Sequence, residues 1–204
     1  GVIGVPLPMD RIRKGVESSV NALAETGSGD AALAIMTTDT VPKEIAVEIA
    51  LSNGTVRIGA IAKGSGMIAP DMATMICVIT TDAEIDAPAL DKALRSAINV
   101  SINCITVDND MSTSDTVLCL ANGASGVRIE GDTADFAAFS EALRALCVDV
   151  AKLLVKDGEG ATKFVEIAIE GADSEDGAKT IARAIANSML VKTAFFGQAP
   201  NWGR

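Results

Sequence analysis

An alternating stretch from Lys43 to Ala62 limits the folds that are open to this chain. Apolar side chains occupy every second position on both sides of Ser52-Asn53-Gly54, a sequence typical of a tight turn between antiparallel strands. The second strand runs directly into Lys63, and the later apolar run Met75–Ile79 is typical of a strand buried on both faces. A hairpin interrupts the alternation of a doubly wound βαβ sheet. We therefore expect an α+β fold, a layered α/β sandwich.

Helical spacing of apolar residues predicts the elements that cover this sheet. The predicted helices span residues 10–26, 86–102, 133–155 and 174–192, and two further strands span residues 116–122 and 164–171. The apolar run 31–36 fits either a helix or a strand. Polar loops at residues 37–43, 106–115 and 156–163 separate these elements.

The charge balance excludes several classes of partner. The 204 residues carry 17 basic and 27 acidic side chains, a formal net charge of −10. Nucleic acids and anionic membrane surfaces attract positively charged proteins, so we expect neither as a partner. No apolar run approaches the roughly 20 residues that span a bilayer, and no signal-peptide pattern is found. Since the chain begins with glycine, we expect a fragment or a processed piece.

Cysteine chemistry is not expected. The four cysteines, Cys77, Cys104, Cys119 and Cys147, lie far apart in the sequence and match no zinc or redox motif. Each has apolar neighbours. We therefore expect reduced core cysteines in a cytosolic protein.

The chain contains no histidine. This excludes Ser-His-Asp and Cys-His catalysis and every metal site built on histidine. A threonine can act without histidine if it is the first residue of a chain, because its own α-amine then takes the hydroxyl proton. Thr74 follows the small residue Ala73, and cleavage between them would create such a terminus. The alternative is a structural threonine at the start of a strand.

Lys63 is the second candidate for chemistry. It ends a predicted strand, and glycines follow it in an otherwise apolar segment. A cation in this setting suits a carboxylate ligand. The alternative is a lysine whose stem covers apolar surface while its ammonium group reaches water.

Two other motifs give weaker evidence of a functional site. The glycines after Lys63 do not form a phosphate-binding loop, because the lysine precedes them, and no GxGxxG opens a helix. Asp108, Asp110 and Asp115 loosely resemble a calcium loop, but its glycine at position six and its final glutamate are absent. A turn with side-chain caps is the favoured interpretation of this loop.

The block KGSGMIAPDMATMICVITTDAE, residues 63–84, closely resembles the signature of the ornithine acetyltransferase (glutamate N-acetyltransferase) family. Other segments match in the same order as in the family: GVIGVPLP and IMTTDTVPKE before this block, and GEGATKF and a final NWGR after it. The resemblance covers essentially the whole chain. It implies an acyltransferase of arginine biosynthesis that moves an acetyl group from N2-acetylornithine to glutamate through an acetyl-threonine intermediate.

The resemblance also implies a layered α/β sandwich that cleaves itself between Ala73 and Thr74, with Thr74 as the N-terminal nucleophile. Residues 1–73 would then end the α piece, and residues 74–204 would begin the β piece. The two pieces would stay together as an α/β heterodimer within a higher oligomer. The resemblance implies no metal and no bound cofactor, with acetyl-CoA as a co-substrate of some members. It implies a cytoplasmic protein, or one of the mitochondrial matrix in a eukaryote.

Site residues follow from the same resemblance. Thr37, Lys63, Thr74 and Glu159 match the family's substrate-binding positions. Lys63 would pair with the substrate α-carboxylate, and Glu159 would face a substrate ammonium group. Gly1 matches the glycine of the family's oxyanion hole, whose threonine would precede it.

Some features depart from the family pattern. The family loop DGDTSTND is DNDMSTSD here, and Ala199 stands where an aspartate commonly precedes Pro-Asn-Trp. The family is about twice as long, so we expect this chain to hold an incomplete site. Two other functions stay open: a related N-terminal-nucleophile amidohydrolase or aminopeptidase, and an inactive fragment or binding protein that keeps the fold.

Overall fold

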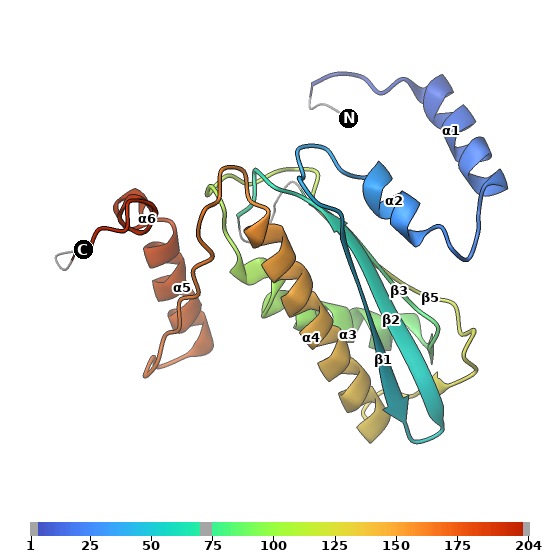
Figure 1. Ribbon diagram of the computed structural model, residues 1–204. Coiled ribbons are helices and arrows are strands. Elements are labelled where there is room, and N and C mark those ends of the chain that lie inside the picture. The colour runs from blue at the N-terminus through green and yellow to red at the C-terminus, as the bar shows by residue number, and fades with distance from the viewer. Residues whose placement is uncertain (1–3, 70–74, 202–204) are drawn as a thin grey trace.

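A four-stranded sheet forms the centre of the computed structural model, which describes residues 4–69 and 75–201 (Figure 1). The strand order is β1–β2–β3–β5, and β5 alone runs parallel to its neighbour. The bounds are Lys43–Leu51 for β1, Gly54–Lys63 for β2, Ile76–Thr81 for β3 and Thr116–Ala121 for β5. The mixed α+β class is thereby confirmed.

The predicted hairpin is confirmed. Lys43 lies opposite Ala62 at its open end, and Leu51 lies opposite Gly54 at the turn. Gly54 has a φ of +150°, and a Cβ there would meet a methyl group of Val127 at 2.6 Å. Only glycine suits this turn, because side chains are disfavoured by both the backbone angle and the neighbour.

Two helices cover one face of the sheet, α3 (Ala87–Asn99) and α4 (Ala134–Lys156). Each begins at a side-chain cap: Asp86 accepts from the N–H of Ala89, and Thr133 from that of Phe136. Their apolar faces meet the inward-facing side chains of β2 in one core. The small elements nearby are η1 (Ile102–Cys104) and the parallel pair β4 (Glu84–Ile85) and β6 (Arg128–Ile129), which the sequence did not predict.

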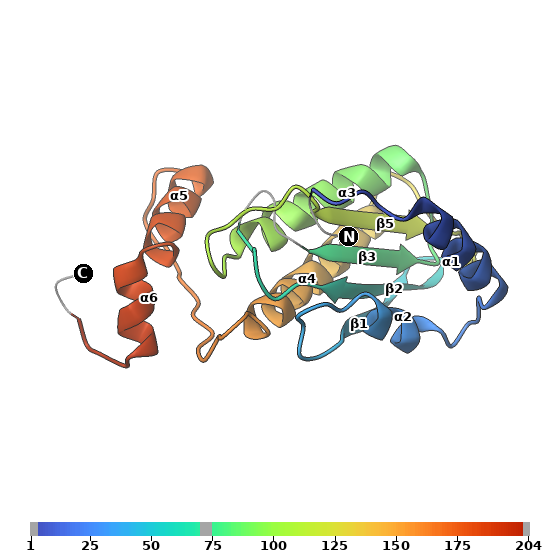
Figure 2. The same cartoon turned by 90° about the horizontal axis from the view of Figure 1, so that it is seen from above.

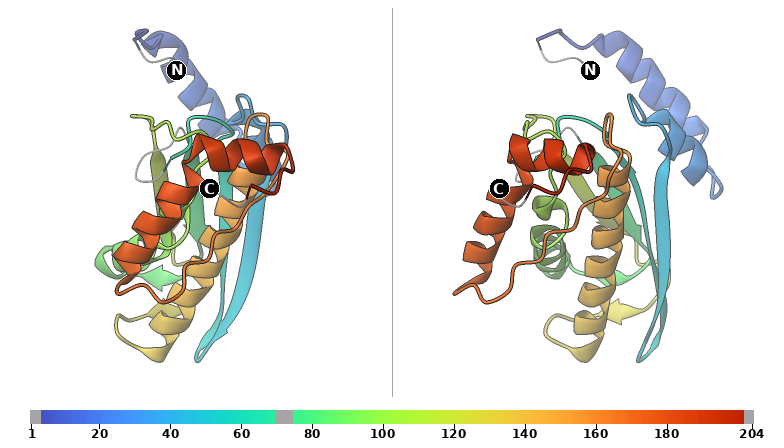
Figure 3. Two further views of the ribbon diagram at one scale, coloured as in Figure 1. Left: turned by 90° about the vertical axis from the view of Figure 1, so that its left-hand side faces the viewer. Right: turned by 60° about the vertical axis from the view of Figure 1, so that its left-hand side comes forward.

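The other face of the sheet is largely open. The helix α2 (Ser28–Ala34) contacts β1 and β2 there, on the side away from α4 (Figure 3), and decides the ambiguous run 31–36 in favour of a helix. Outward-facing Ile76, Leu118 and Leu120 are 39%, 49% and 57% exposed. The expectation that β3 is buried on both faces is therefore wrong within the described residues, since no described element covers this part of the sheet.

The first helix, α1 (Met9–Asn21), buries none of its residues. Its apolar residues Ile12, Val16 and Val20 face solvent. It ends at Asn21, so the predicted extension to residue 26 is wrong.

The C-terminal part forms a pair of helices, α5 (Glu175–Ala186) and α6 (Met189–Phe196), beside the sheet and its helices (Figure 2). A single helix over residues 174–192 was predicted. The chain breaks at Ser188 instead, because this side chain caps a new helix by accepting from the N–H of Val191. The N-terminal cap of α5, Ser174, was predicted as the helix start.

The predicted strand at residues 164–171 is wrong: this segment is irregular. Its alternation is typical of a strand, but a strand needs a neighbour to satisfy its N–H and C=O groups. Within the described part of the chain, no strand pairs with it.

The four cysteines, all within the described residues, form no disulfide. Cys77 and Cys147 lie in the core as expected, and burial raises the pKa of each to about 12. Cys104 is exposed, which corrects the expectation of a core position. Among the described helices, none is long and apolar enough to cross a membrane.

Candidate active site

The candidate site lies where β2 ends. Lys63 is the last residue of β2 and pairs with Ile76 of β3. It is 7% exposed, and it makes no ion pair with any described residue. An ammonium group at the end of a strand, with no ion pair to a described residue, is available to bind a carboxylate ligand.

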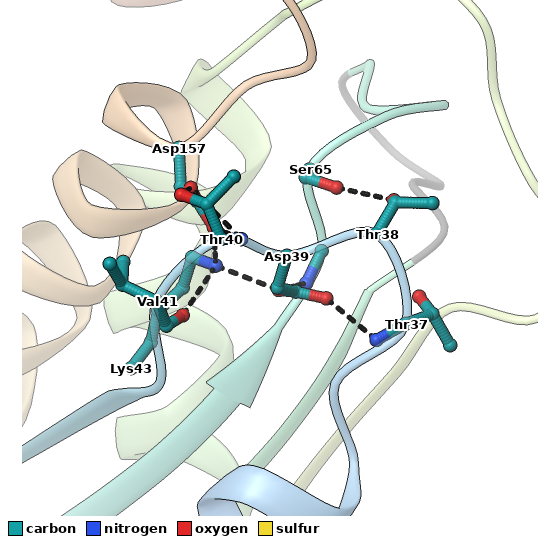
Figure 4. A network of polar contacts seen from close by, with 9 residues as sticks. Thr37, Thr38, Asp39, Thr40, Val41, Lys43, Ser65 and Asp157 are labelled. Carbon is teal, nitrogen blue, oxygen red and sulfur yellow. Dashed lines mark hydrogen bonds and ion pairs between the residues drawn. The ribbon is translucent and has the colours of Figure 1, made fainter.

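The loop at residues 37–40 contacts the segment that follows Lys63. The carboxylate of Asp39 accepts hydrogen bonds from the N–H of Gly64 at 2.7 Å and from the N–H of Thr37 at 3.1 Å. The hydroxyl groups of Thr38 and Ser65 are 2.6 Å apart (Figure 4). Two independent contacts therefore hold the Thr37 loop against the end of β2.

The end of α4 meets the same loop. Asp157 accepts from the N–H of Thr40 at 3.0 Å and from the Thr40 hydroxyl group. The ammonium group of Lys43 joins the two carboxylates, at 2.7 Å from Asp39 and 2.5 Å from Asp157 (Figure 4). Lys43 is 1% exposed, so this ion pair is buried.

The carboxylates of this network are held in their charged form. Burial raises the pKa of Asp39, but the hydrogen bonds from Gly64 and Lys43 outweigh it and lower the pKa to about 2. Burial likewise raises the pKa of Asp157, and the hydrogen bonds from Lys43 and Thr40 bring it below its ordinary value. Both groups are therefore anions at neutral pH.

Glu159 completes the arrangement from the turn after α4. Its backbone N–H donates to the carbonyl oxygen of Ser65 at 2.6 Å. Its carboxyl group lies directly over Gly66, where a Cβ would come within 2.7–2.9 Å of it. Glu159 also lines a groove of about 330 Å³ beside α6. The three predicted residues Thr37, Lys63 and Glu159 thus come from segments that contact one another.

Asp115 lies at the start of β5, near Lys63. Its Oδ1 accepts from the N–H of Met75 at 2.9 Å, while its Oδ2 is buried with no partner among the described residues. Burial raises the pKa of Asp115 to about 6, against the opposing effects of the Met75 N–H and the Lys63 charge. A carboxyl group of this kind can change its protonation near neutral pH.

The rest of the acidic loop caps turns, as predicted. Asp108 accepts from the N–H of Asp110 at 3.2 Å, and Ser112 accepts from that of Ser114 at 3.1 Å. Asp108 also accepts from the N–H groups of Met67 at 2.5 Å and Ile68 at 3.0 Å. The loop therefore fixes the chain after Gly66.

The predicted nucleophile Thr74, its neighbour Ala73 and the oxyanion residue Gly1 lie outside the described residues. Their roles stay predictions.

Sequence reasoning missed Lys43, Asp39 and Asp157. A signal for Lys43 was present. Alternate residues of a strand lie on the same face, so Lys43 lies on the face of Ile45 and Val47, and the hairpin pattern placed a lysine on the apolar face. Nothing in the sequence distinguished Asp157 from other aspartates near helix ends.

Comparisons with known proteins identify the family of the chain. The model of the ArgJ family matches residues 1–204. The chain is 53% identical to the arginine biosynthesis bifunctional protein ArgJ of Symbiobacterium thermophilum and 52% identical to the glutamate N-acetyltransferase of Methanocaldococcus jannaschii. Each match covers 100% of this chain and 51% of the relative. The chain thus spans about half the length of the curated relatives it matches.

A solved structure is also similar. The crystal structure of the arginine biosynthesis bifunctional protein ArgJ from Bacillus halodurans matches with a TM-score of 0.58 and 42% identity. The match covers 61% of this chain and 58% of that one.

Proposed function

Because the chain belongs to the ArgJ family, we propose that it supplies much of the site of a glutamate N-acetyltransferase, which moves an acetyl group from N2-acetylornithine to glutamate. The names of the relatives in Symbiobacterium and Methanocaldococcus support this assignment. The observation that carries it is the meeting of the three segments that bear Thr37, Lys63 and Glu159 at the end of β2.

Substrate binding follows from the charges. The ammonium group of Lys63, which has no ion pair among the described residues, would bind a substrate carboxylate. The carboxylate of Glu159 would bind an ammonium group, and Thr37 would add a hydroxyl. Both N2-acetylornithine and glutamate carry a carboxylate, so one anchor serves the donor and the acceptor in turn.

In the proposed chemistry, the chain is cleaved between Ala73 and Thr74, so that residues 1–73 end one piece and residues 74–204 begin the other. The Thr74 α-amine takes the proton of its own hydroxyl group, and the oxygen attacks the acetyl carbonyl carbon. The bond from this carbon to the ornithine nitrogen breaks, the proton passes to that nitrogen, and acetyl-Thr74 remains. The backbone N–H of Gly1 would help to stabilise the oxyanion.

In the second half of the reaction, the amine of glutamate attacks the acetyl ester. Thr74 recovers its hydroxyl proton as N-acetylglutamate leaves. We propose that these reaction steps need no metal and no bound cofactor. Acetyl-CoA would enter only as another acetyl donor. We propose an α/β heterodimer in a higher oligomer, with the cytoplasm as its location.

The test uses the chain together with the regions that its relatives have beyond the matched half. Intact mass spectrometry should show two pieces that divide before Thr74, and the protein should form N-acetylglutamate from N2-acetylornithine and glutamate. Thr74→Ala should stay whole and transfer nothing, whereas Thr80→Ala, a change on the open face of β3, should behave as wild type. Rapid acetate release without glutamate would instead indicate a hydrolase. An uncleaved, inactive wild-type protein would contradict the proposal.

A further inference from the structure

The buried ion network around Lys43 leaves no polar group unsatisfied. The Lys43 ammonium group donates to Asp39, to Asp157 and to the carbonyl oxygen of Val41, at 2.7, 2.5 and 3.5 Å. Each carboxyl oxygen of the two aspartates has at least one donor. Networks that are fully satisfied in this way are rigid.

The remaining hydrogen bonds of the network come from loop residues: backbone N–H groups and the hydroxyl group of Thr40. Asp39 accepts from the N–H of Thr37, a predicted substrate residue, and from that of Gly64, the residue after Lys63. Asp157 accepts from Thr40 and lies two residues before Glu159. Each carboxylate is thus joined to a segment that carries a predicted substrate residue.

Stability alone is a weak reason for such a network. Removing charges from water is costly, and replacing a buried ion pair by apolar groups of similar size is often neutral or stabilising. Breaking the network by removing one partner is destabilising for a different reason, because it leaves an unpaired buried charge. A stability measurement on a single variant therefore does not reveal what the network does.

We propose that Lys43 is a positioning residue of the site: its ammonium group, bound to Asp39 and Asp157, fixes the Thr37 and Glu159 segments relative to Lys63. This inference rests on the proposed acetyl transfer. Lys43 itself is fully enclosed by protein and touches no substrate. Its effect on binding is indirect, through the separation of two groups that must contact opposite ends of one ligand.

The decisive comparison is between Lys43→Met and the neutral triple variant Asp39→Asn/Lys43→Met/Asp157→Asn, in the protein extended as above. Lys43→Met should lower the melting temperature, since it leaves two buried carboxylates without a cation. The triple variant leaves no unpaired charge, but an asparagine at position 39 can accept from only one of the Thr37 and Gly64 N–H groups, so it should melt between Lys43→Met and wild type. Both variants should raise KM for N2-acetylornithine and for glutamate by about 10- to 100-fold, because the site is misaligned.

Arg57→Met is the matched control. It breaks an exposed ion pair with Glu48 on the same hairpin and should change neither the melting temperature nor KM.

Hydrogen exchange gives a measure that does not depend on activity. In the triple variant, the amides of Thr40 and Glu159 should exchange faster than in wild type, while core amides of β2 stay protected. A triple variant with wild-type KM and wild-type exchange would overturn the inference. If the wild-type protein transferred no acetyl group, the proposed function would fail, and exchange at these two amides would still decide whether Lys43 fixes the two segments.

Discussion

The backbone N–H of Glu159 donates a 2.6 Å hydrogen bond to the carbonyl oxygen of Ser65, and the Glu159 carboxyl group lies over the next residue, Gly66. The hydrogen bond therefore fixes the position of the Glu159 backbone relative to the segment that follows Lys63. The absence of a side chain at Gly66 is what allows this close approach.

Gly66→Ala should weaken substrate binding with little loss of stability. The added methyl group would fall within 2.7–2.9 Å of the Glu159 carboxyl atoms, so that flexible, exposed side chain must swing away. We expect a free energy of unfolding within about 0.5 kcal/mol of wild type and a higher KM for the substrate that carries the ammonium group. Chemical denaturation and steady-state kinetics measure the two effects. Gly131→Ala is the control, since a Cβ there meets nothing within 4 Å, and equal KM values for the two variants would contradict this role of Glu159.

Lys63→Met should weaken substrate binding without lowering the stability of the fold. The change keeps an apolar stem of similar length and breaks no ion pair with a described residue, so the melting temperature should change little. Loss of the carboxylate anchor should raise KM for both amino-acid substrates, by about 30-fold or more if the contact contributes about 2 kcal/mol or more. Calorimetric titration with glutamate provides a direct check. A lower melting temperature with unchanged affinity would mean that the lysine supports the fold and not the ligand.

Asp115 should make stability fall as pH rises. Its folded-state pKa of about 6 exceeds its ordinary value of 3.8, so the folded protein holds this proton more tightly than the unfolded chain. The stabilising effect of protonation is complete below about pH 4, is lost between pH 4 and 6, and is absent above pH 6. Asp115→Asn should flatten this part of the curve of unfolding free energy against pH, whereas Asp110→Asn, at an exposed position, should leave it unchanged. A parallel curve for Asp115→Asn would show that another group titrates there.

The open face of the sheet should govern self-association of the 204-residue chain alone. Outward-facing Leu118 and Leu120 are about half exposed, and Ile76 lies beside them on the same face. Leu118→Thr/Leu120→Thr should lower the apparent mass in concentrated solution, because it removes apolar contact area. Leu143→Ala, on the buried face of α4, should instead cost about 2–5 kcal/mol of stability. Sedimentation velocity and thermal melting distinguish the two changes, and equal association of the double variant and wild type would contradict the prediction.

The fold was predictable where one stretch of sequence contains both of the strands that pair. The hairpin at residues 43–62 contains both of its strands and its turn, so alternation and Ser52-Asn53-Gly54 were sufficient. Residues 164–171 show equally good alternation but form no strand, because pairing depends on a neighbour that the pattern does not contain. The break at Ser188 was missed for a related reason, since apolar spacing continues across it while the side-chain cap acts locally.

For the candidate site, the sequence pointed to three residues but not to the groups that hold their segments together. The resemblance named Thr37, Lys63 and Glu159, and they lie on segments in contact. The groups that hold those segments were not named. Asp39 lies in a loop rich in threonine and Asp157 at a helix end, and both positions are ordinary for aspartate until the three-dimensional structure brings Lys43 between them.

The ion pair between Lys43 and Asp157 joins residues 114 positions apart in the sequence. Such a contact forms only after α4 has docked on the hairpin, because closing a long loop costs entropy before the contact can repay it. The site is therefore a late product of folding. A partly folded chain with an intact hairpin would have its strands in register and still lack a binding-competent site. Ligand affinity during refolding would then report the completion of the tertiary structure rather than the formation of the sheet.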